Sequence, residues 1–292
     1  MSSYIGRFAP SPTGPLHLGS LAIAVASYLD ARIHHGQWLV RIEDTDENRC
    51  HPEWAQLILH TLQAHGLNWD QEVIIQSKRY ALYETTLQQF NALGLTYPCA
   101  CSRQEIEQAN NHRQPGQNRI YPGTCRAGHS PLATVHSIRF RVPREAIEWY
   151  DYAQGVQHDF LETSTGDFVI HRGDGFWSYH LAGVVDDLST HVTHIVRGQD
   201  LSASTARQVA LMKALQNEPP KYWHLPLVMD KEGKKLSKQN GAPALQNEYA
   251  LHNLHAVGQH FGLPKINANS CNNWLQQAIV CWAQFAKAQT LN

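Results

Sequence analysis

Two short segments of this 292-residue chain carry residues suited to holding phosphate groups. In the first, residues 7–20, a turn rich in proline and glycine leads to His17 at an expected helix start. Free backbone N–H groups and the helix dipole favour an anion there. In the second, residues 234–238, Lys235 and Lys238 lie three positions apart between two glycines, as suits a movable positive charge. Together the two segments predict chemistry on ATP.

Neither segment is specific by itself, because helix-start histidines and short basic runs are usually plain surface residues. Their context strengthens the interpretation. Pro10, Pro12 and Gly14 make a rigid turn that lets a ligand approach the backbone closely. The lysines lie between Gly233 and Gly241, where a loop can open and close over a substrate.

The elements that must position these segments begin with a predicted βαβ unit. Residues 4–9 and 38–42 are short apolar runs typical of buried strands, and residues 17–35 have helical spacing. Such a unit opens a doubly wound α/β sheet, in which ligands bind at the carboxyl ends of the strands. We therefore expect the His17 turn and Glu43, which follows the second strand, to share one edge.

Beyond this unit the chain divides by its composition. Further helices are expected at 51–65, 79–93 and 204–215, and further strands at 136–142, 168–172 and 192–197. The polar stretch 108–123 interrupts the α/β pattern and indicates an inserted subdomain. The expected organisation is a first core half at 1–97, an insert at 98–185, a second core half at 186–240 and a helical segment at 241–292.

Composition excludes several classes of protein. The chain is 42% hydrophobic and 17% charged, which supports a packed core and argues against disorder. A net charge of −1 argues against broad nucleic-acid binding, so any RNA contact would need a local patch. Without an apolar run of membrane length or a signal pattern, a cytoplasmic protein is expected.

Three of the six cysteines form a possible metal site. Cys99 and Cys101 make a C-x-C pair, and Cys125 follows across the polar stretch. On spacing alone, a metal site and three buried thiols are equally consistent with this pattern. The other cysteines are expected to be structural: Cys50, Cys271 and Cys281.

The ordered motifs resemble class I aminoacyl-tRNA synthetases of the glutamyl/glutaminyl subgroup. Residues 17–20, His-Leu-Gly-Ser, are similar to the HIGH element of that class, and residues 235–239 to its KMSKS loop. The resemblance covers about residues 4–240, and residues 7–14 are closer to the glutamate-specific branch. Further matching segments are 41–46, 179–182 with Asp186 and Asp187, and 193–198.

The resemblance implies activation of an amino acid by attack of its carboxylate on the α-phosphate of ATP. His17 and Gly19 would bind ATP together with Lys235. Lys235 and Lys238 would neutralise the phosphates as their loop closes, and Mg²⁺ would bridge them. Catalysis is then expected to depend on His17, Lys235 and Lys238.

A glutamate substrate would bring two carboxylates and one ammonium group. Arg7 and Arg197 are the expected carboxylate partners, because guanidinium matches carboxylate in a fork. Glu43 is the expected ammonium partner, with hydrogen bonds from Ser11 and Tyr179. Three neighbouring charges are equally consistent with structural ion pairs: Arg41, Asp44 and Asp46.

The implied fold is a Rossmann-type catalytic core with an inserted zinc-bearing subdomain and a short helical C-terminal appendage. Relatives carry zinc in the insert through a motif ending in Cys-x-His, but here residues 125–127 read Cys-Arg-Ala. The candidate fourth ligands are Tyr121, His112 and His129. A short branch of the family with a Tyr-x-x-x-Cys arrangement favours Tyr121 beside the three cysteines.

Only residues 239–292 follow Lys238, so no anticodon-binding domain is expected. That length resembles a stand-alone branch of the family, whose members transfer glutamate to queuosine in the anticodon loop of tRNA(Asp). The expected partners are therefore ATP, L-glutamate and queuosine-containing tRNA(Asp). The protein is expected to be a monomer that does not bind a membrane. One alternative is a minimal enzyme that charges the 3′ end of tRNA(Glu). Another is a non-catalytic binding module, against which His17, Lys235, Arg7 and Glu43 argue.

Overall fold

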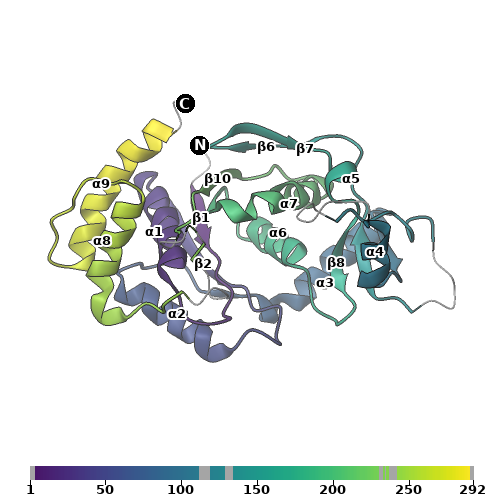
Figure 1. The fold of residues 1–292 in the computed structure, drawn as a ribbon, viewed down its shortest axis with the longest axis horizontal. Coiled ribbons are helices and arrows are strands. Elements are labelled where there is room, and N and C mark those ends of the chain that lie inside the picture. Colours follow the sequence, from purple (N-terminus) through teal and green to yellow (C-terminus); the bar gives the residue numbers. More distant parts are fainter. Residues whose placement is uncertain are drawn as a thin grey trace.

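The chain opens with a parallel βαβ unit (Figure 1). The computed structural model describes residues 4–111, 119–128, 134–229, 233, 235–236 and 242–289. Strand β1 (Ile5–Phe8) pairs in parallel with β2 (Gln37–Ile42), and helix α1 (Leu18–Ile33) connects them. The short strand β3 (Ile74–Ile75) continues this sheet beyond β2. The βαβ unit predicted from apolar periodicity is confirmed.

A second sheet, in the order β7-β6-β10-β9, adjoins the first at β1. Strands β9 (His194–Gly198), β10 (Lys221–Leu225) and β6 (Ile147–Asp151) run parallel, and β7 (Gly155–Asp159) returns antiparallel to β6 as a hairpin. Thr193 joins the two sheets, because its backbone N–H donates to the Ile5 carbonyl and its hydroxyl accepts from the Ile5 N–H.

A third sheet is antiparallel and lies apart from the parallel ones (Figure 1). It contains β4 (Thr96–Cys99), β5 (Ser137–Phe140) and β8 (Phe168–Arg172) in that order. Two short helices belong to the same region: α4 (Arg103–Ala109) and α5 (Leu161–Ser164). Two of the strands of this sheet were predicted, at 136–142 and 168–172.

Most of the remaining helices lie close to their expected positions. They are α2 (Pro52–Ala64), α3 (Tyr80–Ala92), α6 (Tyr179–Ser189), α7 (Ser202–Ala214), α8 (Ala250–His260) and α9 (Cys271–Gln289), with 3-10 turns η1 (Gln76–Arg79), η2 (Gln199–Leu201) and η4 (Asn247–Tyr249). The sequence analysis did not predict α6 or the strands β6, β7 and β10. None of the helices in the described part of the chain is long and apolar enough to cross a lipid bilayer.

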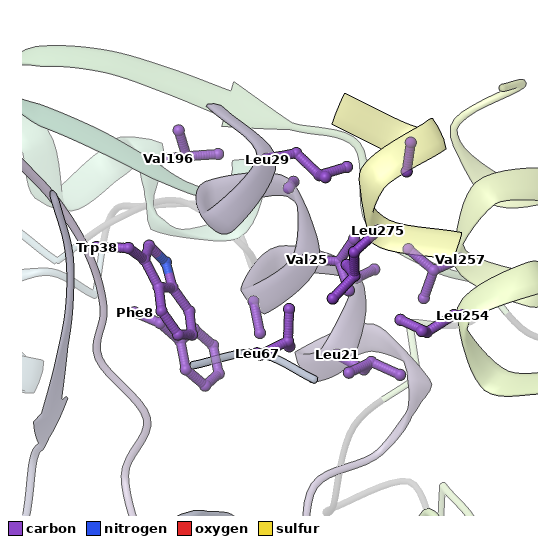
Figure 2. Close-up of a cluster of buried hydrophobic side chains, with 14 of the residues drawn as sticks. Phe8, Leu21, Val25, Leu29, Trp38, Leu67, Val196, Leu254, Val257 and Leu275 are labelled. Carbon is purple, nitrogen blue, oxygen red and sulfur yellow. The ribbon is translucent and has the colours of Figure 1, made fainter. Parts of the chain in front are cut away.

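The C-terminal helices share the hydrophobic core of the βαβ unit (Figure 2). Leu21, Val25 and Leu29 lie on the buried face of α1, and α8 and α9 pack against that helix. Trp274 and Trp282 of α9 are fully buried. The segment expected as an appendage therefore completes the core that supports α1.

A buried carboxylate ties α1 to both ends of the described chain. Asp30 of α1 is 3% exposed and accepts hydrogen bonds from the Tyr4 hydroxyl and, at 3.4 Å, from the Trp282 indole N–H. Burial raises the pKa of Asp30, and the bonds from Tyr4 and Trp282 oppose that rise. The position of Asp30 therefore depends on residues before β1 and on α9.

Candidate active site

A pocket of about 400 Å³ opens at the carboxyl ends of β1 and β9. Seven of the residues predicted from the sequence line it: Arg7, Ser11, His17, Gly19, Tyr179, Arg197 and Lys235. They come from β1 and the turn after it, the start of α1, the start of α6, β9 and the lysine segment. Their convergence follows from parallel strands ending at one edge. Lys238 lies outside the described residues.

His17 is the N-cap of α1, and its hydrogen bonds define its protonated nitrogen. Its Nδ1 accepts from the Ser20 backbone N–H at 3.3 Å, so the neutral ring carries its proton on Nε2, which lies 3.1 Å from the Ser20 hydroxyl. A side chain at Gly19 would meet the His17 ring at 3.1 Å and the Leu236 carbonyl at 3.4 Å. Glycine at this position therefore lets the lysine segment approach the helix start.

Two described residues of the lysine segment, Lys235 and Leu236, line the pocket. Leu236 donates its backbone N–H to the Val228 carbonyl at 2.9 Å, and Met229 forms a β-bridge with Lys235. The Lys235 ammonium group pairs with the Asp200 carboxylate, which follows β9 in η2. Both side chains are partly exposed, so this pair holds the segment in place only weakly.

A buried cluster of charges lies beside the pocket, at the junction of β1, β2 and α6. Arg41 contacts Glu43 at 3.0 Å, Asp187 at 2.5 Å and Asp186 at 3.9 Å. Arg7 also contacts Asp187, at 3.1 Å. Burial raises the pKa of Asp187, but the two guanidinium groups outweigh burial and hold that pKa below its ordinary value.

Glu43 belongs to this cluster rather than to the lining of the pocket. It is 8% exposed, and burial raises the pKa of its carboxyl group although Arg41 and Arg7 act to lower it. Two acids that follow it have structural partners. Asp44 accepts from the Ser77 backbone and hydroxyl, and Asp46 pairs with Arg49 and Arg172. Arg41, Asp44 and Asp46 thus take part in structural contacts.

Arg197 is 2% exposed and is held by three polar side chains. Its Nε donates to His224 Nε2 at 3.0 Å, its Nη1 to Gln208 at 2.7 Å and its Nη2 to Thr205 at 2.8 Å. The sequence analysis missed all three partners. In the sequence, these three residues stand out only as polar residues within otherwise apolar elements. That pattern does not show which residues they contact.

The three cysteines predicted as a metal site lie together. The Sγ atoms of Cys99, Cys101 and Cys125 are all within 4.8 Å of one another. The Tyr121 hydroxyl is 3.4 Å from Cys99 Sγ and 3.7 Å from Cys101 Sγ. Tyr121 therefore supplies a fourth donor atom at the cluster. The other two candidates, His112 and His129, lie outside the described residues.

A nearby arginine supports this cysteine cluster electrostatically. Arg139 Nε donates to Cys99 Sγ at 3.1 Å, and its guanidinium carbon lies 3.7 Å from the centre of the Tyr121 ring. Burial raises the pKa of Cys99, but its hydrogen bonds with Tyr121 and Arg139 outweigh burial and lower the pKa to about 7. A thiolate at neutral pH is the form that binds metal.

Comparison with known proteins decides the family. The family model for tRNA synthetases class I (E and Q), catalytic domain, matches residues 5–254. The chain belongs to this family. That assignment confirms the resemblance inferred from the motifs and the class I catalytic fold, a mixed α/β fold with a parallel sheet.

Within the class I (E and Q) family, the chain is similar to proteins called glutamyl-Q tRNA(Asp) synthetase. One from Verminephrobacter eiseniae is 45% identical over 284 residues, covering 96% of this chain and 97% of the relative. One from Neisseria meningitidis serogroup B is 48% identical over 265 residues, covering 90% of this chain and 89% of the relative.

Among solved structures, the chain is similar to glutamate-tRNA synthetase from Elizabethkingia anophelis. The TM-score is 0.78 at 26% identity, and the match covers 94% of this chain. The chain spans 65% of the length of that structure.

Proposed function

We propose that this chain is a ligase that activates L-glutamate with ATP and transfers the glutamyl group to queuosine in the anticodon loop of tRNA(Asp). The observation that carries the proposal is the 45% identity to a glutamyl-Q tRNA(Asp) synthetase over 97% of that protein's length. We place the reaction in the cytoplasm, where ATP and tRNA are available.

Glutamate would bind between Arg7 and Arg197, which both line the pocket. Each can meet a carboxylate with two parallel N–H donors, which gives orientation as well as charge. Ser11 and Tyr179 line the same pocket and would add hydrogen bonds. Glu43 would attract the substrate ammonium group from the adjoining cluster, where Arg41 holds its carboxylate.

ATP would bind at the start of α1, with its phosphates on the N–H groups of the first turn. A carboxylate oxygen of glutamate forms a bond to the α-phosphorus, and pyrophosphate leaves. His17 Nε2–H and the Lys235 ammonium group would stabilise the charge on the phosphate oxygens, together with Lys238 and Mg²⁺. A hydroxyl of the RNA then attacks the glutamyl carbonyl, and AMP leaves.

One transfer experiment separates this function from the charging of tRNA(Glu). Labelled glutamate, ATP and Mg²⁺ are incubated with queuosine-containing tRNA(Asp) or with unmodified tRNA(Glu), and each RNA is then digested with nuclease. We expect the label on an anticodon-loop nucleoside of tRNA(Asp). Label on a 3′-terminal adenosine of tRNA(Glu) would instead identify a minimal glutamyl-tRNA synthetase.

We also propose that the cysteine cluster binds one structural zinc ion. Three thiols and a phenol within reach of one another match the tetrahedral, sulfur-rich ligand set of structural zinc. The ligands would be Cys99, Cys101, Tyr121 and Cys125. When bound, the ion would cross-link β4 to the segment at 121–125 and so hold these two parts of the expected insert together.

Changing Cys125 to serine should remove the zinc and lower the melting temperature, because a structural ion contributes its binding energy to folding. We expect about one zinc per chain in unchelated wild-type protein by elemental analysis, and much less in Cys125→Ser. Cys281→Ser, in α9, is the matched control and should keep its zinc. Zinc-free wild-type protein, freshly purified without chelator, would refute the site.

A further inference from the structure

The contacts of Arg197 differ from those of Arg7 in one respect. Arg7 is paired with an acid, Asp187, whereas none of the direct partners of Arg197 in the described part of the chain is acidic. A guanidinium group has five N–H donors, and the three bonds of Arg197 use one on each nitrogen. One N–H on each terminal nitrogen remains, and each can donate to a carboxylate oxygen.

The bond to His224 determines the tautomer of that histidine. Arginine can only donate, so His224 Nε2 must accept the Arg197 Nε–H and carries no proton. The proton of the neutral ring is therefore on Nδ1, which donates to Asp151 Oδ2 at 2.5 Å. If the ring carried its proton on Nε2 instead, that N–H would point at the Arg197 Nε–H. Two donors would then face each other, and the hydrogen bond to Arg197 would be lost.

Asp151 is itself held firmly by the backbone around it. It is completely buried at the end of β6. Its Oδ2 also accepts from the His224 backbone N–H at 3.2 Å, and its Oδ1 accepts from the N–H groups of Ala153 and Gln154 at 2.9 Å and 3.2 Å. The hairpin turn therefore fixes the carboxylate that orients the imidazole.

We propose that Asp151 and His224 are positioning residues, which hold Arg197 in the orientation that receives a carboxylate of the substrate. Asp151 selects the His224 tautomer, and His224 Nε2 fixes the rotation of the guanidinium group about its long axis. The proposal rests on the proposed function, because it takes glutamate as the ligand of Arg197. Neither residue lines the pocket.

The charges around His224 agree with a neutral ring. Burial lowers its pKa and Arg197 lowers it further, while Asp151 and Asp200 act to raise it, and the net pKa lies below the ordinary value. The other groups facing the ring are the Thr205 hydroxyl, 3.3 Å from Nε2, and the Tyr222 ring, stacked at 5.8 Å between centroids. Protonation of His224 at Nε2 would place an N–H there, facing the Nε–H of Arg197, and the hydrogen bond between them would be lost.

Two substitutions at His224 separate its two contacts. The amide nitrogen of asparagine can take the place of Nδ1, whereas the amide oxygen of glutamine can take the place of Nε2. His224→Asn should therefore keep the bond to Asp151 and lose the acceptor for Arg197. We expect its KM for glutamate to rise about tenfold, with the KM for ATP unchanged. In His224→Gln the KM for glutamate should stay within about threefold of wild type.

The measurement is glutamate-dependent ATP–pyrophosphate exchange, made with tRNA(Asp) present, beside thermal unfolding of each variant. A pH profile of the wild type needs no variant. Because the pKa of His224 lies below the ordinary histidine value, the wild-type KM for glutamate should rise only as the pH falls through that lowered pKa, and the profile of His224→Gln should be flatter.

Several outcomes would overturn the proposal. An unchanged KM for glutamate in His224→Asn, an equal rise in both variants, or a parallel rise in the KM for ATP would each do so. If both variants unfold, a wild-type KM for glutamate that does not change on acidification would also overturn it. Wild-type protein without glutamate-dependent exchange would overturn the proposed function itself, and this inference with it.

Discussion

Replacing Arg41 with methionine is expected to destabilise the protein by roughly 3–5 kcal/mol. Arg41 is 1% exposed and contacts the carboxylates of Glu43, Asp186 and Asp187. Methionine retains much of the volume but removes the central positive charge. Asp186 would keep Arg79 and Asp187 would keep Arg7, whereas Glu43 would lose its ion-pair partner at 8% exposure.

The free energy of unfolding, measured by chemical denaturation at neutral pH, checks this expectation. Arg49→Met is the matched control, because the Arg49 side chain is 67% exposed and pairs with Asp46 on the surface. Its cost should stay below about 0.5 kcal/mol. A loss of less than about 1 kcal/mol in Arg41→Met would contradict the argument that this buried charge balances the cluster.

The wild-type cluster should also make stability depend on pH. The pKa of Asp187 is lower in the folded protein than its ordinary value. Its contribution to stability is therefore fully present above the unfolded pKa of about 3.9, and is lost as the pH falls through the folded value. Removing Arg41 takes away the largest opposing charge while Arg7 remains, so this contribution should be smaller in the variant.

Replacing Arg7 with alanine is expected to reduce glutamate activation by at least about a hundredfold while leaving the fold intact. Arg7 lies at the end of β1, is 5% exposed and lines the pocket beside Arg197. Asp187 would still have Arg41 as its partner, so the stability cost should be smaller than in Arg41→Met. The substrate carboxylate that Arg7 binds, in contrast, would have no second arginine in place of Arg7.

Pyrophosphate exchange at saturating ATP, with glutamate varied, measures this effect. Arg7→Lys should fall between wild type and Arg7→Ala, because lysine keeps the charge beside Asp187 but lacks the two-pronged fork. Circular dichroism would verify that each variant is folded. Near-normal activation by Arg7→Ala would remove Arg7 from the glutamate site.

Local pattern was enough to predict the framework of the pocket. The β1-α1-β2 unit follows from apolar periodicity and a proline-glycine turn, which are properties of adjacent residues. The convergence of Arg7, His17 and Arg197 then follows from a general rule about parallel strands. For the cysteines, spacing left three candidate fourth ligands, and the structure places the hydroxyl of Tyr121 beside them.

The supports of Arg197 could not be predicted in this way. Asp151 and His224 are polar residues on strands β6 and β10, 73 positions apart in the sequence, and the bond between their side chains forms only when the two strands pair. No local period encodes such a pairing. The role of α9 was missed for a related reason, because helical spacing shows that Trp274 and Trp282 lie on an apolar face but not which surface covers that face.

The packing of α9 against α1 has a consequence for how the chain folds on the ribosome. At about 5–20 residues per second, α1 leaves the ribosome many seconds before α9 has been synthesised. During that time the part of α1 that packs against α8 and α9 is uncovered, and Asp30 lacks the indole N–H of Trp282. The helix that begins beside His17 is therefore among the first to be made, but its packing is completed only after α9 has been synthesised.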